Sequence, residues 1–176
     1  MNEALDLYKR ELLRWNEKIN LIGPEAREHL DEHIAEAVAA GEILKPEGEV
    51  LDFGSGGGLP AIPMAIMTPR ARFHLVEADQ KKWAFLKHVV RTCTLNAVVY
   101  GERLERVQFP EGLHFSLVIS RAVGDAERWL PELASRVERA ALFVGSGEAP
   151  QIHHFRKLSE HRLARGSLVV FHVERP

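Results

Sequence analysis

The chain of 176 residues is poor in cysteine and in long apolar runs, and each shortage excludes a class of protein. Cys93 is its single cysteine, so no internal disulfide can form, and the chain suits a reducing compartment. No stretch approaches the roughly twenty apolar residues that a membrane span needs. The first residues include Glu3, Asp6 and Glu11, which a secretory signal peptide would not carry. We therefore expect a cytoplasmic protein with no membrane partner.

The chain also lacks a strong excess of either charge, because its formal net charge is −2. This value does not indicate nucleic-acid binding, but the charges are unevenly spread. Residues 1–49 hold six Lys or Arg against twelve Asp or Glu, whereas residues 70–91 hold six against two. A local basic patch is compatible with a phosphate-bearing substrate, and a solvated helix face explains the same charges equally well.

Length and composition predict a single domain, because 45% hydrophobic and 27% charged residues are ordinary values for a globular chain. We expect residues 1–45 to form a helical extension and residues 46–176 to form the core. Apolar spacing predicts helices over residues 2–22 and from about 24 to 43. Strands and helices then alternate. We expect strands at 49–53, 72–77, 97–100, 115–120, 140–144 and 167–173, and helices at about 61–67, 80–93, 125–137 and 150–160.

This alternation predicts an α/β fold, a doubly wound and mostly parallel sheet of the Rossmann-like kind with helices on both faces. A ligand of such a sheet binds outside the carboxyl ends of the strands. Residues Val50–Pro60 supply the turn that such a site requires. An apolar run ends at Asp52, and Gly54, Gly56 and Gly58 then alternate before a helix. These residues are candidates for binding a nucleotide-like cofactor.

The glycine spacing separates two classes of cofactor. A dinucleotide fingerprint requires Gly-x-Gly-x-x-Gly, but Leu59 stands three residues after Gly56. The observed Gly-x-Gly-x-Gly is typical of S-adenosylmethionine sites, and a turn that serves only tight packing is the alternative. Glu77 follows the second strand, nineteen residues after Gly58. A carboxylate at this distance accepts hydrogen bonds from a ribose diol, although surface glutamates at strand ends are common.

Five motifs follow one another in order over roughly residues 12–124. They are Leu12-Leu13-Arg14-Trp15-Asn16-Glu17-Lys18-Ile19-Asn20-Leu21, Gly54-Ser55-Gly56-Gly57-Gly58-Leu59-Pro60, Leu75-Val76-Glu77-Ala78-Asp79-Gln80-Lys81-Lys82, Arg103-Leu104-Glu105 and Val118-Ile119-Ser120-Arg121-Ala122. Together they resemble the glucose-inhibited division protein B family, bacterial methyltransferases that act on guanine N7 in small-subunit ribosomal RNA. The resemblance implies a class I S-adenosylmethionine methyltransferase fold.

The resemblance also implies which residues bind the cofactor. Gly54 and Leu59 would contact the methionine end of S-adenosylmethionine, and Glu77 would contact the ribose. Leu104 and Glu105 would flank the adenine.

The acceptor side involves a different set of residues. Arg121 would lie near the transferred methyl group and the target nucleotide, where its guanidinium suits a phosphate or a guanine edge. A surface ion pair is the alternative for Arg121. Lys81 and Lys82 begin a helix beside the site and could hold RNA phosphates, or could form a solvated helix end.

Three departures from the family pattern weaken the assignment of the RNA substrate. Ala61 replaces the usual Gly after the proline, and residues 32–37 replace a usual Arg-His-x-x-Asp-Ser. Residues 145–148 read Gly-Ser-Gly-Glu instead of the expected Lys-Gly. The C-terminal part is also short, so we expect one of the two final strands.

His29, Glu32 and His33 match the His-x-x-Glu-His spacing of some zinc hydrolases. The two histidines would lie one helical turn apart, but no third ligand is evident, and chance matches are easy in a chain with nine histidines. We expect no metal site here.

The hypothesis from the sequence is S-adenosylmethionine-dependent methylation of guanine N7 in 16S ribosomal RNA, by a monomer that binds ribosomal RNA or the small ribosomal subunit. Neutral guanine N7 has a lone pair and loses no proton before attack, so no general base is expected. Arg121 would position the acceptor. Two alternatives remain, namely a methyltransferase of a small molecule or protein and a non-catalytic relative that binds cofactor or RNA.

Overall fold

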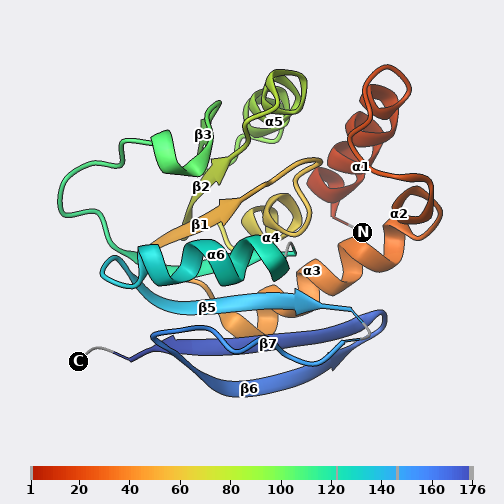
Figure 1. Cartoon of the computed structure of the whole chain (residues 1–176). Coiled ribbons are helices and arrows are strands. Elements are labelled where there is room, and N and C mark those ends of the chain that lie inside the picture. The colour runs from red at the N-terminus through yellow and green to blue at the C-terminus, as the bar shows by residue number, and fades with distance from the viewer. Residues whose placement is uncertain (1, 122, 146, 175–176) are drawn as a thin grey trace.

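The computed structural model describes residues 2–121, 123–145 and 147–174. Within them one sheet has the strand order β3-β2-β1-β4-β5-β7-β6 (Figure 1). Its strands are β1 (Glu49–Phe53), β2 (Arg72–Val76), β3 (Ala97–Tyr100), β4 (Phe115–Ser120), β5 (Val137–Val144), β6 (Phe155–Leu163) and β7 (Gly166–Val173). The strands from β3 to β5 pair in parallel, and β7 joins β5 antiparallel. The predicted α/β fold with a mostly parallel sheet is confirmed.

The strand order reverses between β1 and β4, which lie side by side although two strands separate them in sequence. Asp52 of β1 is in register with Leu75 of β2 on one side and Ile119 of β4 on the other. Loops that leave the carboxyl ends of these strands diverge to opposite sides of the sheet, so a crevice opens between them. The fold therefore places the glycine turn at the point where a ligand is expected.

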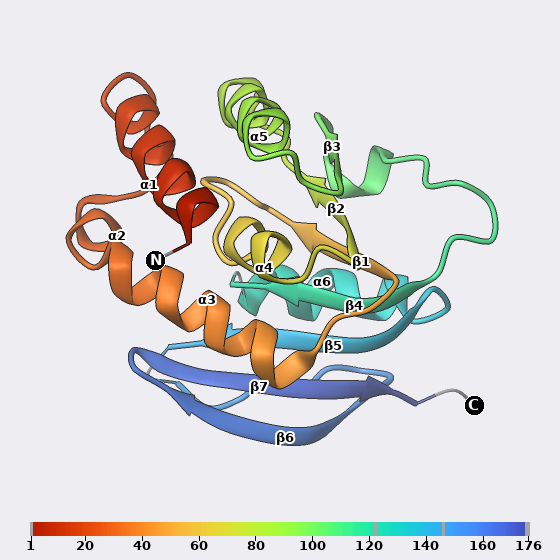
Figure 2. The same ribbon diagram turned by 180° about the vertical axis from the view of Figure 1, so that it is seen from behind.

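Helices cover both faces of the sheet (Figure 2). On one face, α4 (Ala61–Met67) and α5 (Gln80–Thr92) share a buried apolar cluster with α1 (Glu3–Asn16) and α3 (Leu30–Leu44). On the other face, α6 (Val123–Leu133) covers a second cluster that includes Leu51, Val118 and Leu142. A short 3₁₀ helix, Leu104–Arg106, follows β3. In the described residues, no helix is long and apolar enough to cross a membrane.

The N-terminal helices end earlier than the apolar spacing predicts. The first ends at Asn16, whose side-chain Oδ1 accepts hydrogen bonds from the backbone N–H groups of Leu21 and Ile22 at 2.8 and 2.9 Å. This contact offers the backbone an alternative to continuing the helix. The second predicted helix is divided at His29 into α2 (Pro24–Glu28) and α3, because His29 leaves helical geometry at φ −107° and ψ 25°.

The prediction of a helix at 150–160 is wrong, and so is the prediction of a single final strand. Residues 155–163 form the edge strand β6, which pairs with β7 as an antiparallel hairpin. An edge strand with one solvated face carries many charged residues, so β6 lacks the apolar run by which a buried strand is recognised. The helix expected at 125–137 also ends early, at Leu133, and Val137 already belongs to β5.

Candidate active site

The glycine turn after β1 is bound tightly to the end of β2. The backbone N–H groups of Gly54 and Ser55 both donate to the carbonyl of Val76, at 2.9 and 3.1 Å. Gly58 adopts φ +86°, and a Cβ there would lie 2.4 Å from the side chain of Ile62 in the following helix. Both the backbone angle and the close approach require glycine at this position. The turn therefore presents bare backbone to the crevice.

The N-terminal extension forms the wall behind this turn. Tyr8 is fully buried, and its hydroxyl donates to the carbonyl of Gly57 at 2.8 Å. A Cβ on Gly57 would lie 3.0 Å from Ile22 and 3.2 Å from Leu12, so the extension touches the turn directly. Burial raises the pKa of Tyr8 well above its usual range, which keeps the hydroxyl a donor. The apolar spacing of residues 2–22 predicts only a helix around Tyr8, and nothing in this spacing reveals the contact with the turn.

Glu77 lies directly after β2, as the sequence predicts, and its carboxylate also contacts the glycine turn. Its Oε2 accepts from the backbone N–H of Gly56 and its Oε1 from that of Asp79, both at 2.8 Å. Each carboxylate oxygen keeps a second lone pair after these contacts. The buried carboxylate can therefore hold the turn in shape and still accept hydrogen bonds from a ribose diol.

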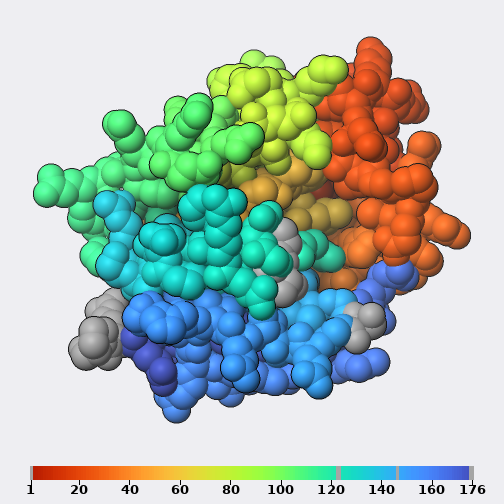
Figure 3. Space-filling model, viewed as in Figure 1, coloured from red at the N-terminus to blue at the C-terminus, as the bar shows by residue number. Residues whose placement is uncertain are grey.

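A groove of about 300 Å³ runs past Glu77 along the carboxyl ends of β1, β2 and β3. In the space-filling view, golden residues of the β1 region are visible between the green segment after β3 and the teal helix α6 (Figure 3). The groove brings together Gly54, Glu77, Leu104 and Glu105, four of the predicted cofactor residues. Phe53 and Trp129 add apolar walls that suit a flat base. Trp129 has no signal in the sequence, because α6 meets this edge only through tertiary packing.

Asp52 is buried beside the turn, with a side chain 2% exposed. Its Oδ2 has no hydrogen-bond partner within the part of the chain that the structure describes. Burial raises the pKa of Asp52 to about 7, with Ser55 and Arg121 opposing the shift and Glu77 adding to it. A buried carboxylate with one oxygen left without a partner favours a cationic ligand, because a cation restores the interaction energy that the carboxylate loses on leaving water. The ammonium or sulfonium of S-adenosylmethionine fits this requirement.

Arg121 follows β4 but does not line that groove. Its Nη1 donates to Nδ1 of His33 at 3.2 Å, and its Nη2 lies 3.8 Å from Oε2 of Glu36. The guanidinium also lies over the ring of Phe143, with Cζ 4.6 Å from the centroid. Burial lowers the pKa of Arg121 from its usual high value. These contacts hold Arg121 in a second cavity, of about 250 Å³, near the ends of β4 and β5.

The remaining predicted residues lie at the margin of the site. Lys81 and Lys82 begin α5, where their backbone N–H groups donate to the capping Asp79 side chain at 2.9 and 3.0 Å. Neither lines the groove. Leu59 is half-buried against the apolar core, next to the cis peptide bond to Pro60, and it does not line the groove either. Ala122 and Ser146, from the predicted motifs, lie outside the described residues.

A hollow larger than this groove lies elsewhere. It measures about 950 Å³ and lies over the β6–β7 hairpin, against residues 147–153. None of the predicted cofactor residues lines it. The smaller groove at the glycine turn is the better candidate, because carboxylates and a bare backbone converge there.

The His-x-x-Glu-His residues are engaged in other contacts. Nδ1 of His29 lies 3.2 Å from Oε1 of Glu32, and Nδ1 of His33 accepts from Arg121. Across residues 2–121, 123–145 and 147–174, no three His, Cys, Asp or Glu side chains are grouped as ligands of one metal ion. His29 lies between α2 and α3, so the three residues of this spacing do not share one helix, and their side chains take part in ion pairs and hydrogen bonds.

A glycine turn after β1, a carboxylate after β2 and a doubly wound sheet define the class I methyltransferase fold. A SAM dependent methyltransferase from Aquifex aeolicus shares it with a TM-score of 0.66, at 11% identity over 95% of this chain and 98% of that one. A human methyltransferase 10 domain containing protein shares it with a TM-score of 0.59, at 10% identity over 97% and 96%. At such low identities the likeness establishes the fold alone.

The chain belongs to the GidB family, rRNA small subunit methyltransferase G, whose model matches residues 1–164. Relatives called Ribosomal RNA small subunit methyltransferase G include those of Helicobacter acinonychis, 39% identical over 127 residues, and Polynucleobacter asymbioticus, 40% identical over 133 residues. Each alignment covers 72% of this chain, and it covers 70% and 60% of the two relatives. The predicted resemblance is confirmed, and the chain spans somewhat more than half the length of these relatives.

Proposed function

We propose that this protein transfers a methyl group from S-adenosylmethionine to guanine N7 in small-subunit ribosomal RNA. The observation that carries the proposal is the groove beside the glycine turn, which is lined by Glu77 and by the backbone of Gly54. Asp52 is buried next to this turn, and its Oδ2 has no hydrogen-bond partner among the described residues. The names of the relatives support a small-subunit ribosomal RNA acceptor. Such an acceptor would place the protein in the cytoplasm.

The cofactor side of the mechanism follows from the charges of the groove. S-adenosylmethionine supplies a methyl group already activated by a positively charged sulfur. The Asp52 carboxylate would pair with a positive group of the methionine end, while Glu77 would hold the ribose. Leu104 and Glu105 would flank the adenine, and Leu59 would support the methionine end through the shape of the turn.

The acceptor side needs orientation rather than proton transfer. Guanine N7 attacks through its own lone pair, so the residues at β4 and β5 mainly have to align the base and exclude water. The product base carries a positive charge, so Arg121 is better suited to positioning than to direct contact with N7. Its contacts with His33 and Phe143 fix the guanidinium and support that role. Lys81 and Lys82, at the start of α5, would contact RNA phosphates.

The test is transfer of tritium from labelled S-adenosylmethionine to small ribosomal subunits, and to their RNA, from cells that lack their own guanine-N7 methylation. Reduction and aniline treatment then cleave the RNA at 7-methylguanosine. Label in the RNA at a cleavable position supports the proposal. Cofactor binding without label in either substrate would refute it and favour another acceptor or a non-catalytic binder.

A further inference from the structure

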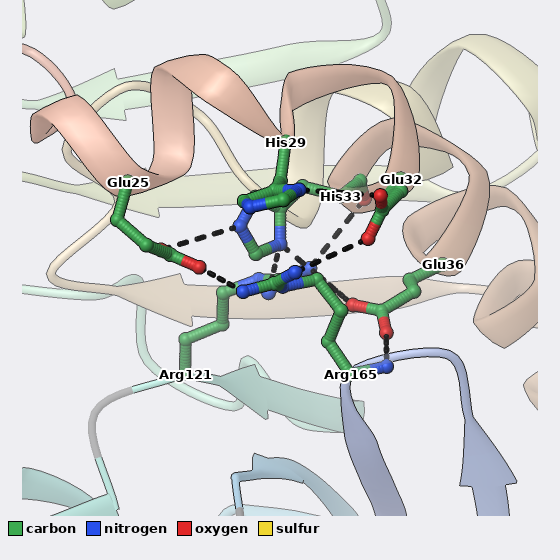
Figure 4. Close-up of polar contacts among 7 residues, drawn as sticks. All are labelled: Glu25, His29, Glu32, His33, Glu36, Arg121 and Arg165. Atoms are coloured by element: carbon green, nitrogen blue, oxygen red, sulfur yellow. Dashed lines mark hydrogen bonds and ion pairs between the residues drawn. The ribbon is translucent and has the colours of Figure 1, made fainter.

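The cavity beside Arg121 is built from groups that the cofactor does not use. It is lined by Glu25, His33, Glu36, Arg121, Phe143 and Arg165, among others. These residues come from α2, α3, the ends of β4 and β5, and the turn between β6 and β7 (Figure 4). The cavity therefore lies at the carboxyl edge of the sheet, on the opposite side of β1 from the cofactor groove.

His33 presents an unused hydrogen-bond donor in this cavity. Arg121 can only donate, so Nδ1 of His33 is the acceptor and the ring proton lies on Nε2. Burial and the charge of Arg121 lower the pKa of His33, which keeps the imidazole neutral. The ring is 12% exposed, and Nε2 is buried with no partner among the described residues. A buried donor of this kind requires an acceptor.

Glu25 presents a carboxylate next to that donor. Its Oε2 lies 3.9 Å from Nε2 of His33, too far for a hydrogen bond between them. The Glu25 side chain is 63% exposed and bonds the guanidinium of Arg165, which also donates to Glu32 at 3.2 Å. The carboxylate of Glu36, by contrast, is 6% exposed and is bonded to the backbone N–H of Arg165 at 2.6 Å. Glu25 is therefore the carboxylate that a ligand can reach.

We propose that His33 and Glu25 recognise the Watson–Crick edge of the guanine to be methylated. That edge presents O6 as an acceptor beside N1–H and N2–H₂ as donors. The His33 Nε2–H would donate to O6, and the Glu25 carboxylate would accept from N1–H and N2–H₂. Adenine has a donor where guanine has O6, so it cannot satisfy His33.

This arrangement leaves N7 free for methyl transfer. N7 lies on the far side of O6 from N1, so an edge held by His33 and Glu25 directs N7 away from Glu25. Flipped-out bases in single-stranded RNA are commonly read on this edge and stacked on aromatic or arginine planes. The Arg121 guanidinium stacked on Phe143 provides such a plane at the cavity wall. The inference rests on the proposed function and names the group that selects guanine.

The first test compares Glu25→Gln with Glu32→Gln in transfer of tritium to small subunits. Both variants remove one side-chain contact of Arg165, but only Glu25 lines the cavity. An amide cannot accept both guanine donors, so Glu25→Gln should lower kcat/KM about ten- to a hundredfold while the Kd for S-adenosylmethionine is unchanged. Glu32→Gln should change kcat/KM less than threefold. Equal effects of the two variants would overturn the proposal.

The second test does not depend on the ribosomal substrate. Guanosine or inosine, which lacks the 2-amino group, is titrated into the full chain saturated with S-adenosylhomocysteine, and the imidazole NMR signals of His33 are followed. The wild type should bind guanosine about tenfold more tightly than inosine, and Glu25→Gln should remove the preference. Equal affinities, or no shift of His33, would refute the pocket even if ribosomal RNA is methylated. If guanosine is preferred but ribosomal RNA is not methylated, the pocket stands and the ribosomal acceptor fails.

Discussion

Replacing Asp52 with Asn tests whether the buried carboxyl is kept for a cation. In the protein without cofactor, burial raises the pKa of Asp52 from an ordinary 3.8 to about 7. The folded state therefore holds a proton that the unfolded state releases between these two values. The contribution of Asp52 to stability is fully present below pH 4 and is lost as the pH rises to 7. Above pH 7 the folded protein carries an unpaired buried charge.

The size of this effect follows from the pKa difference of roughly three units. At 1.36 kcal/mol per unit, the free energy of unfolding should fall by about 4 kcal/mol between pH 4 and pH 8 because of Asp52 alone. The Asn side chain is nearly isosteric and cannot ionise. We expect Asp52→Asn to be more stable than the wild type at pH 8 by a few kcal/mol, and to keep less than half of this advantage at pH 5.

Urea unfolding of both proteins at pH 5 and pH 8 measures the effect. The difference between the proteins isolates Asp52, because all other titrating groups are shared. Titration with S-adenosylhomocysteine, whose ammonium is retained, should show the opposite ranking, with binding at pH 8 at least tenfold weaker in the variant. Parallel pH profiles of the free energy of unfolding in the two proteins would refute the claim that burial raises the pKa of Asp52. Equal cofactor affinities would show that Asp52 meets no cation.

Three further substitutions test the turn and the basic helix. Tyr8→Phe removes one buried hydrogen bond worth about 1 kcal/mol, so the Kd for S-adenosylmethionine, measured by calorimetry, should rise about fivefold. An unchanged Kd would mean that the hydroxyl does not hold the turn. Gly58→Ala should lower the free energy of unfolding by about 2–4 kcal/mol, because its Cβ would lie 2.4 Å from the side chain of Ile62. The control Gly124→Ala in α6 has open space around its Cβ and should not lower the free energy of unfolding. Replacing Lys81 and Lys82 together with Gln should raise KM for small subunits and reduce its salt dependence without changing kcat; an unaltered salt slope would exclude phosphate contacts.

The cofactor side was largely predictable from sequence because its signals are local. Gly54, Gly56 and Gly58 lie within one turn, and Glu77 stands at a fixed distance after it, so chain connectivity alone brings them together. The groove does unite Gly54 and Glu77 with the residues after β3. Strands β1 to β4 were found for the same reason, since each is a short apolar run between turn signals.

The acceptor side was not predictable because it depends on packing between distant segments. The position of Arg121 against His33 and Glu36 requires α3 to lie beside the end of β4. The contact of Arg165 with α2 and α3 requires the β6–β7 hairpin, and the charged edge strand β6 was mistaken for a helix. Tyr8 likewise has no motif around it. Local patterns carry no information about such pairings.

The Arg165 contact also sets an order for the synthesis of the protein. The cofactor turn is complete once α1 to α5 and the first strands have left the ribosome, because Tyr8 and Glu77 supply its support from within that stretch. The cavity at Arg121 closes only when the last hairpin docks and its turn reaches Glu25 and Glu36. A growing chain thus completes its glycine turn well before the cavity at Arg121 can close, and the last part to dock is the part that, in the proposed role, restrains which base is accepted.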